Sequence, residues 1–139
     1  LSSPSQIAYI HKIDKTLFMH GGLSDFFVHR WVTQSGQKAI GKAIKEINKM
    51  GGGLMWDSAS PIWYRPQFAP DNDASRLFRG GKYLQVVGHT PVKDVILEGG
   101  VLSCDTFSTY RDGTPYGSRK FCIVDTDTWQ FETVQTTHE

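Results

Sequence analysis

Two short apolar runs, each ending at a histidine, are the clearest feature of the hydrophobic pattern. Residues 16–19 run into His20 and two glycines, and residues 83–87 run into a glycine and His89. The second run is almost wholly apolar, which predicts a central strand that is buried on both faces. Each run therefore places an imidazole at the carboxyl edge of a strand, where α/β sheets bind ligands and where glycine lets another group come close.

The remaining pattern predicts helices early in the chain and strands late. In residues 37–50 apolar side chains recur at helical spacing, lysines hold the other face, and three glycines follow that should end the helix. Ser24 is placed to cap a short helix over residues 25–31, and residues 74–79 are expected to form a helical turn. Strands are expected over residues 7–13, 16–19, 83–87, 101–107, 121–125 and 129–134. This order indicates an α/β layered domain with a mixed or antiparallel sheet at its C-terminal end.

The composition is that of an ordinary globular protein of one domain. The 139 residues are 39% hydrophobic and 21% charged, and 15 basic residues against 14 acidic ones give a net charge of +1. The basic residues are scattered, so no nucleic-acid partner is expected, and no apolar stretch is long enough to span a membrane. Cys104 and Cys122 lie in alternating apolar runs, which favours buried free thiols over a disulfide. A cytoplasmic location is expected on this basis.

His20 and His89 are the leading candidates for metal ligands, because neutral imidazole binds zinc, iron and manganese. Either histidine alone would more often be structural, but their shared setting after an apolar strand favours a joint metal site. Asp25, Asp94 and Asp105 are the carboxylates to consider, and none lies at a convincing spacing from a histidine. Hard divalent ions also need carboxylates and water. The shortage of ligands, in a chain that opens without methionine, indicates a missing segment.

The proline-rich loop 54–73 carries several large aromatic side chains and Arg65. Such side chains usually pack over a site or a partner. The planar guanidinium of Arg65 is suited either to a bidentate contact with phosphate or to stacking on Trp63 or Tyr64. The sequence favours neither interpretation over the other. Further on, the loop 111–117 reads as a solvated hairpin. Tyr110 and Tyr116 are the candidate substrate-binding residues if this loop instead faces the site.

Three motifs follow one another along the chain: His20-Gly21-Gly22-Leu23, Ile62-Trp63-Tyr64-Arg65 and Gly88-His89-Thr90-Pro91. In order and approximate spacing they resemble the calcineurin-like metallophosphoesterases, above all the branch of serine/threonine protein phosphatases and symmetrical dinucleoside-tetraphosphate hydrolases. The resemblance covers only the C-terminal half of that domain, since the Asp-x-His, Gly-Asp-x-x-Asp-Arg-Gly and Gly-Asn-His-Glu motifs of the N-terminal half do not occur. It implies that residues 1–139 are the C-terminal portion of one α/β/β/α sandwich, with a mixed sheet and helices packed on the outside.

The resemblance also implies a metal-dependent phosphoesterase that hydrolyses a phosphoprotein or a dinucleoside polyphosphate through a metal-bridging hydroxide. It assigns His20 and His89 to the second of two divalent ions (manganese, iron or zinc) and Arg65 to orienting the phosphate. Thr90 and Pro91 depart from relatives that carry a second histidine after the first. In those relatives this histidine binds the first metal, so that metal would depend here on the absent half.

A chain that holds part of such a site is expected to be catalytically inactive alone. It is also expected to self-associate through the sheet that its missing half would cover, or to pair with a complementary chain. The alternative is a non-catalytic peptide-binding or assembly module. Such a module would use the aromatic loop 56–68 and keep the histidines for core hydrogen bonds.

Overall fold

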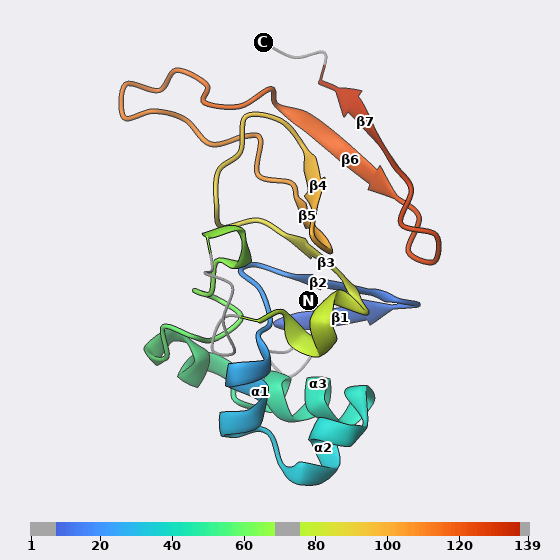
Figure 1. Cartoon of the computed structure of the whole chain (residues 1–139). Coiled ribbons are helices and arrows are strands. Elements are labelled where there is room, and N and C mark those ends of the chain that lie inside the picture. The colour runs from blue at the N-terminus through green and yellow to red at the C-terminus, as the bar shows by residue number, and fades with distance from the viewer. Residues whose placement is uncertain (1–7, 69–75, 137–139) are drawn as a thin grey trace, which may run out of the picture.

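The structure is a computed structural model that describes residues 8–68 and 76–136. Within these residues the α-helices lie on one side of a five-stranded sheet, and a two-stranded sheet lies on the other side (Figure 1). The expected α/β class, with a mixed sheet and helices packed on the outside, is confirmed. None of the helices in the described ranges is long and apolar enough to cross a bilayer.

The larger sheet is mixed and has the strand order β1-β2-β3-β5-β4. β1 (Ile10–Ile13) and β2 (Thr16–Met19) form an antiparallel hairpin, and β2 runs parallel to β3 (Leu84–Val87). β3 runs parallel to β5 (Val101–Ser103), which pairs antiparallel with β4 (Ile96–Glu98). β6 (Lys120–Val124) and β7 (Phe131–Gln135) form the separate two-stranded sheet. Because β2 and β3 are parallel neighbours, their carboxyl ends meet at one edge.

The helices follow the amphipathic pattern with one break. α1 (Asp25–Trp31) has the predicted limits, and the Ser24 hydroxyl caps it by accepting the Phe27 N–H at 3.1 Å. The helix predicted over residues 37–50 is two helices, α2 (Gln34–Lys38) and α3 (Ile40–Lys49), because Ala39 is extended. The Glu46 carboxylate accepts the N–H of Thr33 at 3.0 Å and its hydroxyl at 2.7 Å. This contact holds the start of α2 against α3 and explains the bend.

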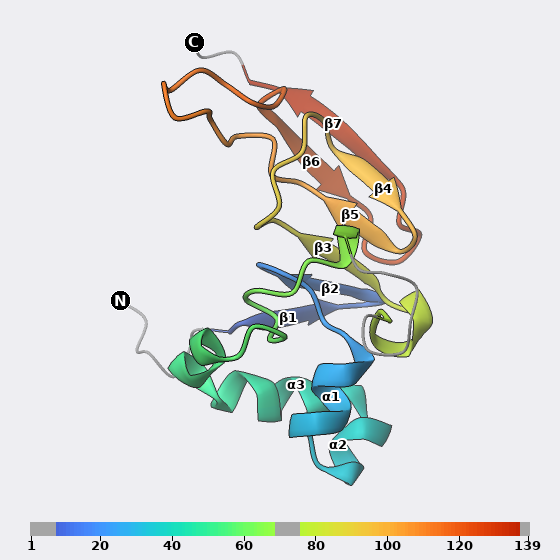
Figure 2. The ribbon, with the colours of Figure 1, turned by 60° about the vertical axis from the view of Figure 1, so that its left-hand side comes forward.

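The main core lies between the helices and the face of the sheet that they cover (Figure 2). Side chains alternate along a strand, so one set of strand residues points to the helices. The buried side chains on this face of the sheet include Leu17, Met19, Val87 and Val101, and those from the helices include Phe27, Val28, Ala43 and Ile47. On the opposite face the Thr16 hydroxyl donates to the Thr126 carbonyl at 2.8 Å, which ties β2 to the turn between β6 and β7.

Gln85 is a fully buried polar side chain within the core strand β3. Its Oε1 accepts the Leu23 N–H at 2.9 Å, and its Nε2 donates to the Leu23 carbonyl at 2.9 Å. A buried backbone N–H and C=O without partners would be costly, so the side-chain amide takes the place that a neighbouring strand would have. Gln85 thereby holds the segment after His20 against the strand that leads to His89.

Several predicted limits differ from the structure. The strand predicted over residues 101–107 ends at Ser103, because the Thr106 hydroxyl bonds the backbone of Lys120 instead of continuing the ladder. β4 was not predicted, since its three residues are all exposed and show no alternation. The helical turn expected over residues 74–79 lies partly outside the described residues, and a 3-10 turn occupies Phe78–Gly81.

Replacing Gln85 with leucine should lower the free energy of unfolding by about 1–3 kcal/mol. Leucine keeps the bulk but leaves the buried Leu23 N–H without a partner, while the Leu23 carbonyl keeps the hydrogen bond from the Phe78 N–H at 2.9 Å. Urea denaturation followed by tryptophan fluorescence measures the change. Gln34→Leu, at the exposed start of α2, is the control and should change stability by less than about 0.5 kcal/mol. Equal losses in the two variants would contradict the role given to Gln85.

Candidate metal and phosphate site

The structure brings His20 and His89 together at the carboxyl ends of β2 and β3. Met19 and Val87 are paired in register, so the residues that follow them lie side by side. Nε2 of His20 lies 3.1 Å from Nδ1 of His89, and the ring centroids are 4.8 Å apart. The backbone supports the contact, since the Gly88 N–H donates to the His20 carbonyl at 3.0 Å. The two side chains are thus neighbours in space, and their role as metal ligands stays a prediction.

His89 has a backbone conformation that is rare for a residue other than glycine. Its φ is +57°, and the Thr90 N–H donates back to the Gly88 carbonyl at 2.5 Å, which makes His89 the central residue of a γ-turn. A left-handed residue of this kind costs about 1–3 kcal/mol and persists only where its surroundings hold it. Such strain gathers at functional sites, and here the strained residue is the one whose imidazole meets His20.

Gly21 and Gly22 let the loop of residues 60–66 lie directly against the end of β2. The Pro61 carbonyl accepts the Gly21 N–H at 2.7 Å and the Gly22 N–H at 3.2 Å. A Cβ on Gly21 would lie 2.5 Å from the Pro61 oxygen and 2.8 Å from the Tyr64 oxygen, and a Cβ on Gly22 would lie 2.7 Å from Cδ of Pro66. No side chain fits in either gap, so the packing of this loop explains the two glycines after His20.

The same loop carries an indole to the edge of the His89 ring. Nε1 of Trp63 donates to the Met55 carbonyl at 2.9 Å, which fixes the orientation of the indole. The Trp63 and His89 rings then meet edge to face with centroids 5.7 Å apart. The Ser60 hydroxyl donates to the Leu54 carbonyl at 2.7 Å and holds the base of the loop. One wall of the site is therefore rigid and aromatic.

Arg65 is exposed and lines the hollow into which His89 faces. The hollow has a volume of about 460 Å³, and its other walls come from Met55, Trp56, Ser58 and Trp63. The sequence indicated an aromatic loop over a site and named Trp63 as a stacking partner for Arg65, but it did not identify Met55 or Ser58 as residues of the site. Only the composition of the loop pointed to these residues, and composition does not show which side chains turn toward the histidines.

Burial lowers the pKa of His89, and the positive charges of Arg65 and His20 act in the same direction. A hydrogen bond to the backbone of Trp63 acts in the opposite direction. With a lowered pKa the imidazole is neutral near pH 7 and has one nitrogen lone pair free, which is the form that binds a metal. A backbone partner for the other nitrogen is the usual device that orients a ligating histidine.

The two facing nitrogens fit two positions of one coordination sphere. Ligand nitrogens that are each about 2.1 Å from one ion lie about 3.0–3.4 Å apart in octahedral or tetrahedral geometry, and the observed distance is 3.1 Å. Within residues 8–68 and 76–136, no group of three or more His, Cys, Asp and Glu side chains is placed to hold a metal ion. The residues present therefore fit part of a metal site, with two of its ligands.

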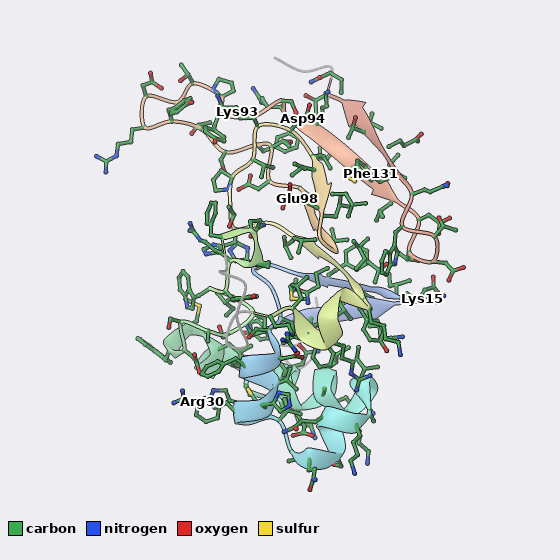
Figure 3. The ribbon with its side chains drawn as sticks, viewed as in Figure 1. Lys15, Arg30, Lys93, Asp94, Glu98 and Phe131 are labelled. Carbon is green, nitrogen blue, oxygen red and sulfur yellow. The ribbon has the colours of Figure 1, made fainter. Side chains whose placement is uncertain are left out.

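The three carboxylates considered from the sequence are engaged elsewhere. Asp25 accepts the Arg79 N–H at 2.9 Å. Asp94 and Asp105 each accept a serine hydroxyl, at 3.1 Å and 2.8 Å. Asp94 also lies 3.5 Å from the Lys120 ammonium group, and Figure 3 shows it near the two-stranded sheet.

Tyr110 and Tyr116 do not line the hollow that holds His89. Their rings pack against each other with centroids 5.4 Å apart, and the Lys93 ammonium group lies 5.6 Å from the centre of the Tyr116 ring. Tyr116 lines a second hollow of about 470 Å³, whose walls include Thr90 and Lys93. A role of the two tyrosines in substrate binding stays a prediction.

No protein-family model matches this chain, and no curated protein matches it. Solved structures of a phosphatase are similar to it. A cold-active protein tyrosine phosphatase has 21% identity and a TM-score of 0.51, over 94% of this chain and 43% of that one. The cold-active protein-tyrosine phosphatase of a psychrophilic Shewanella species has 22% identity and a TM-score of 0.50, over 94% and 44%. The similarity establishes the fold, which matches part of a phosphatase domain, and the chain spans less than half the length of these structures.

Gly21→Ala should lower the free energy of unfolding by about 1–3 kcal/mol, because the new methyl group pushes the loop of residues 60–66 away from β2. Urea denaturation measures the loss. Gly41→Ala is the matched control, since nothing lies within 4 Å of a Cβ at this position in α3. It should raise stability by about 0.5–1 kcal/mol through helix propensity. A loss at Gly41 as large as that at Gly21 would refute the packing explanation.

Proposed function

We propose that this chain is the C-terminal, metal- and phosphate-binding portion of a metal-dependent phosphoesterase of the calcineurin-like type. The observation that carries the proposal is the 3.1 Å approach of two imidazole nitrogens, from His20 and His89, at a strand edge beside Arg65. The motifs around these residues and the fold similarity to part of a phosphatase support the same class.

His20 and His89 hold one divalent cation through Nε2 and Nδ1, the atoms that face each other. When bound, a pair of manganese, iron or zinc ions supplies an activated water and offsets charge on the phosphate. The γ-turn at His89 and the wall at Trp63 keep the imidazole in place before any ion binds. In this proposal the remaining ligands belong to the other half of the domain, so residues 1–139 alone are inactive.

Arg65 binds a non-bridging oxygen of the phosphate. Its guanidinium offers a planar pair of N–H donors, and Pro66 and the anchored loop restrict its backbone. The same positive charge contributes to the lowered pKa of His89. In this proposal Arg65 contacts the phosphate directly, and its charge adds to the effect of burial in lowering the pKa of His89.

The similar phosphatase structures are the basis for two further parts of the proposal, the domain assignment and the substrate class. The matched phosphatase chains are covered to 43% and 44%, and two imidazoles do not complete a site for hard divalent ions. Residues 1–139 are therefore assigned to the C-terminal portion of one domain. The names of the similar structures favour a phosphoprotein over a dinucleoside polyphosphate as substrate.

A second candidate function is a peptide-binding module built on the loop 56–68. The observation that favours it is the exposure of large apolar side chains on this loop, since Trp56 is 89% exposed and Phe68 is 69% exposed. Exposed aromatic side chains of this size mark contact surfaces. In this reading the contact between His20 and His89 is a structural hydrogen bond.

Manganese binding tests the first proposal. Paramagnetic Mn²⁺ should broaden the imidazole NMR signals of His20 and His89 at concentrations that leave His11 unaffected. His89→Asn should weaken binding by at least about 10-fold, because one of two ligand nitrogens is lost. His11→Asn, at an exposed position of β1, is the control and should bind as the parent chain does.

Equal broadening of all histidine signals, or equal binding by the two variants, would contradict the metal site. A chain that binds no manganese but binds peptides, with the binding lost in Trp56→Ala, would support the module instead.

Phosphate binding tests Arg65. In the presence of manganese, Arg65→Lys should weaken binding of inorganic phosphate about 5- to 10-fold, because lysine keeps the charge but loses the two-pronged contact. Arg65→Ala should weaken it further. Isothermal titration calorimetry measures both, and Arg111→Lys, in the exposed loop 111–117, should leave the affinity unchanged. Unchanged affinity in Arg65→Ala would remove this arginine from the proposal.

A further inference from the structure

Cys104 and Cys122 are free thiols, partly buried, that lie on the two arms of a long irregular hairpin. Three backbone hydrogen bonds of 2.9 to 3.0 Å close this hairpin, from Tyr110 to Thr114, from Tyr116 to Ser108 and from Arg119 to Thr106. Successive bonds lie farther from the turn on both arms. The arms are therefore antiparallel, and the cysteines lie beyond the last of these bonds.

Thr106 and Lys120 set the register just before the cysteines. The Thr106 hydroxyl donates to the Lys120 carbonyl at 2.8 Å and accepts the Lys120 N–H at 3.0 Å. Cys104 lies two residues before Thr106 and Cys122 two residues after Lys120, so the cysteines stand opposite each other.

The two thiols are in contact. Their side chains are hydrogen-bonded to each other, and Sγ of Cys104 also lies 3.7 Å from the Leu102 carbonyl. Burial raises the pKa of Cys104 to about 12, and the neighbouring Cys122 adds to this rise. Burial also raises the pKa of Cys122, while the hydrogen bond with Cys104 lowers it. Cys122 is therefore the thiol that loses its proton more easily.

We propose that Cys104 and Cys122 are a disulfide-forming pair, which closes when the protein meets an oxidant of the disulfide class such as glutathione disulfide. The thiolate of Cys122 attacks one sulfur of the oxidant, forms a mixed disulfide and releases one glutathione thiolate. Cys104 then loses its proton and attacks the Cys122 sulfur, which releases the second glutathione. The protein gives up two protons and two electrons, and the oxidant becomes two molecules of glutathione.

The bond would join the two-stranded sheet to a residue that is hydrogen-bonded to β3, the strand that leads to His89. The Cys104 N–H donates to the Val87 carbonyl at 3.0 Å, and Val87 directly precedes the turn that holds His89. Closing the disulfide therefore attaches β6 covalently to a residue that is hydrogen-bonded to β3. Since the link restrains the unfolded chain, the oxidised form should also be the more stable one.

Equilibration in glutathione redox buffers tests the proposal. The reduced chain is incubated for hours at about pH 8, because the raised thiol pKa values make exchange slow. Acid quenching, alkylation and mass spectrometry then give the fraction in the disulfide form. The native chain should reach half-oxidation at a glutathione disulfide level at least about 10-fold lower than the same chain in denaturing urea. An equal or higher requirement in the native chain overturns the proposal, as does a disulfide between two chains.

Single variants separate ring closure from simple thiol reactivity. Cys104→Ser should accumulate a mixed disulfide at Cys122, and Cys122→Ser should stay reduced under the same conditions. A mixed disulfide that persists in the parent chain would show that the two sulfurs do not meet and would overturn the proposal. The comparison of native and urea-treated parent chain involves no substitution, so a variant that fails to fold leaves that test intact.

Discussion

The carbonyl of Pro61 is the contact on which the candidate site depends. It accepts the backbone N–H groups of Gly21 and Gly22, directly after His20, and so docks the loop of residues 60–66 on the end of β2. That loop carries Trp63 to the edge of the His89 ring and Arg65 to the wall of the same hollow. Three segments that are far apart in the sequence thus meet because two positions have no Cβ. A site assembled in this way depends on backbone proximity more than on any single side chain.

The chemistry of the site follows from how its two imidazoles are held. A γ-turn at His89, a backbone hydrogen bond at Trp63 and the parallel pairing of β2 with β3 all fix ring nitrogens in one place without an ion. Such preorganisation lowers the cost of binding, since the ligands need not be ordered first. The nearby charge of Arg65 would repel a cation but attract a phosphate. Under the proposed function, this arrangement would favour binding of a metal ion and an anionic ester together over binding of either one alone.

Much of this arrangement could be predicted from local sequence, and the parts that could not depend on long-range contacts. The two strand-to-histidine patterns and the Ser24 cap of α1 are encoded within a few residues, which is why their limits agree with the structure. The division of the predicted helix at Ala39 depends on Glu46 reaching back to Thr33, and no local pattern contains that contact. The same is true of Gln85, whose place in an apolar strand makes sense only beside Leu23.

Two features of the described residues lead to the same inference. One is the exposed apolar face of the two-stranded sheet, and the other is the incomplete ligand set beside the histidine pair. The outer face of the two-stranded sheet exposes large apolar side chains, with Phe121 at 59%, Ile123 at 55% and Val134 at 44%. A two-stranded sheet is marginal by itself and normally packs its apolar face on further structure. The histidine pair likewise offers nitrogen ligands and lacks the oxygen ligands that divalent ions require. An additional layer of structure could cover the apolar face of β6 and β7. The same layer could supply carboxylate ligands at the edge beside His20. Both observations support the proposed assignment of residues 1–139 to one portion of a larger domain.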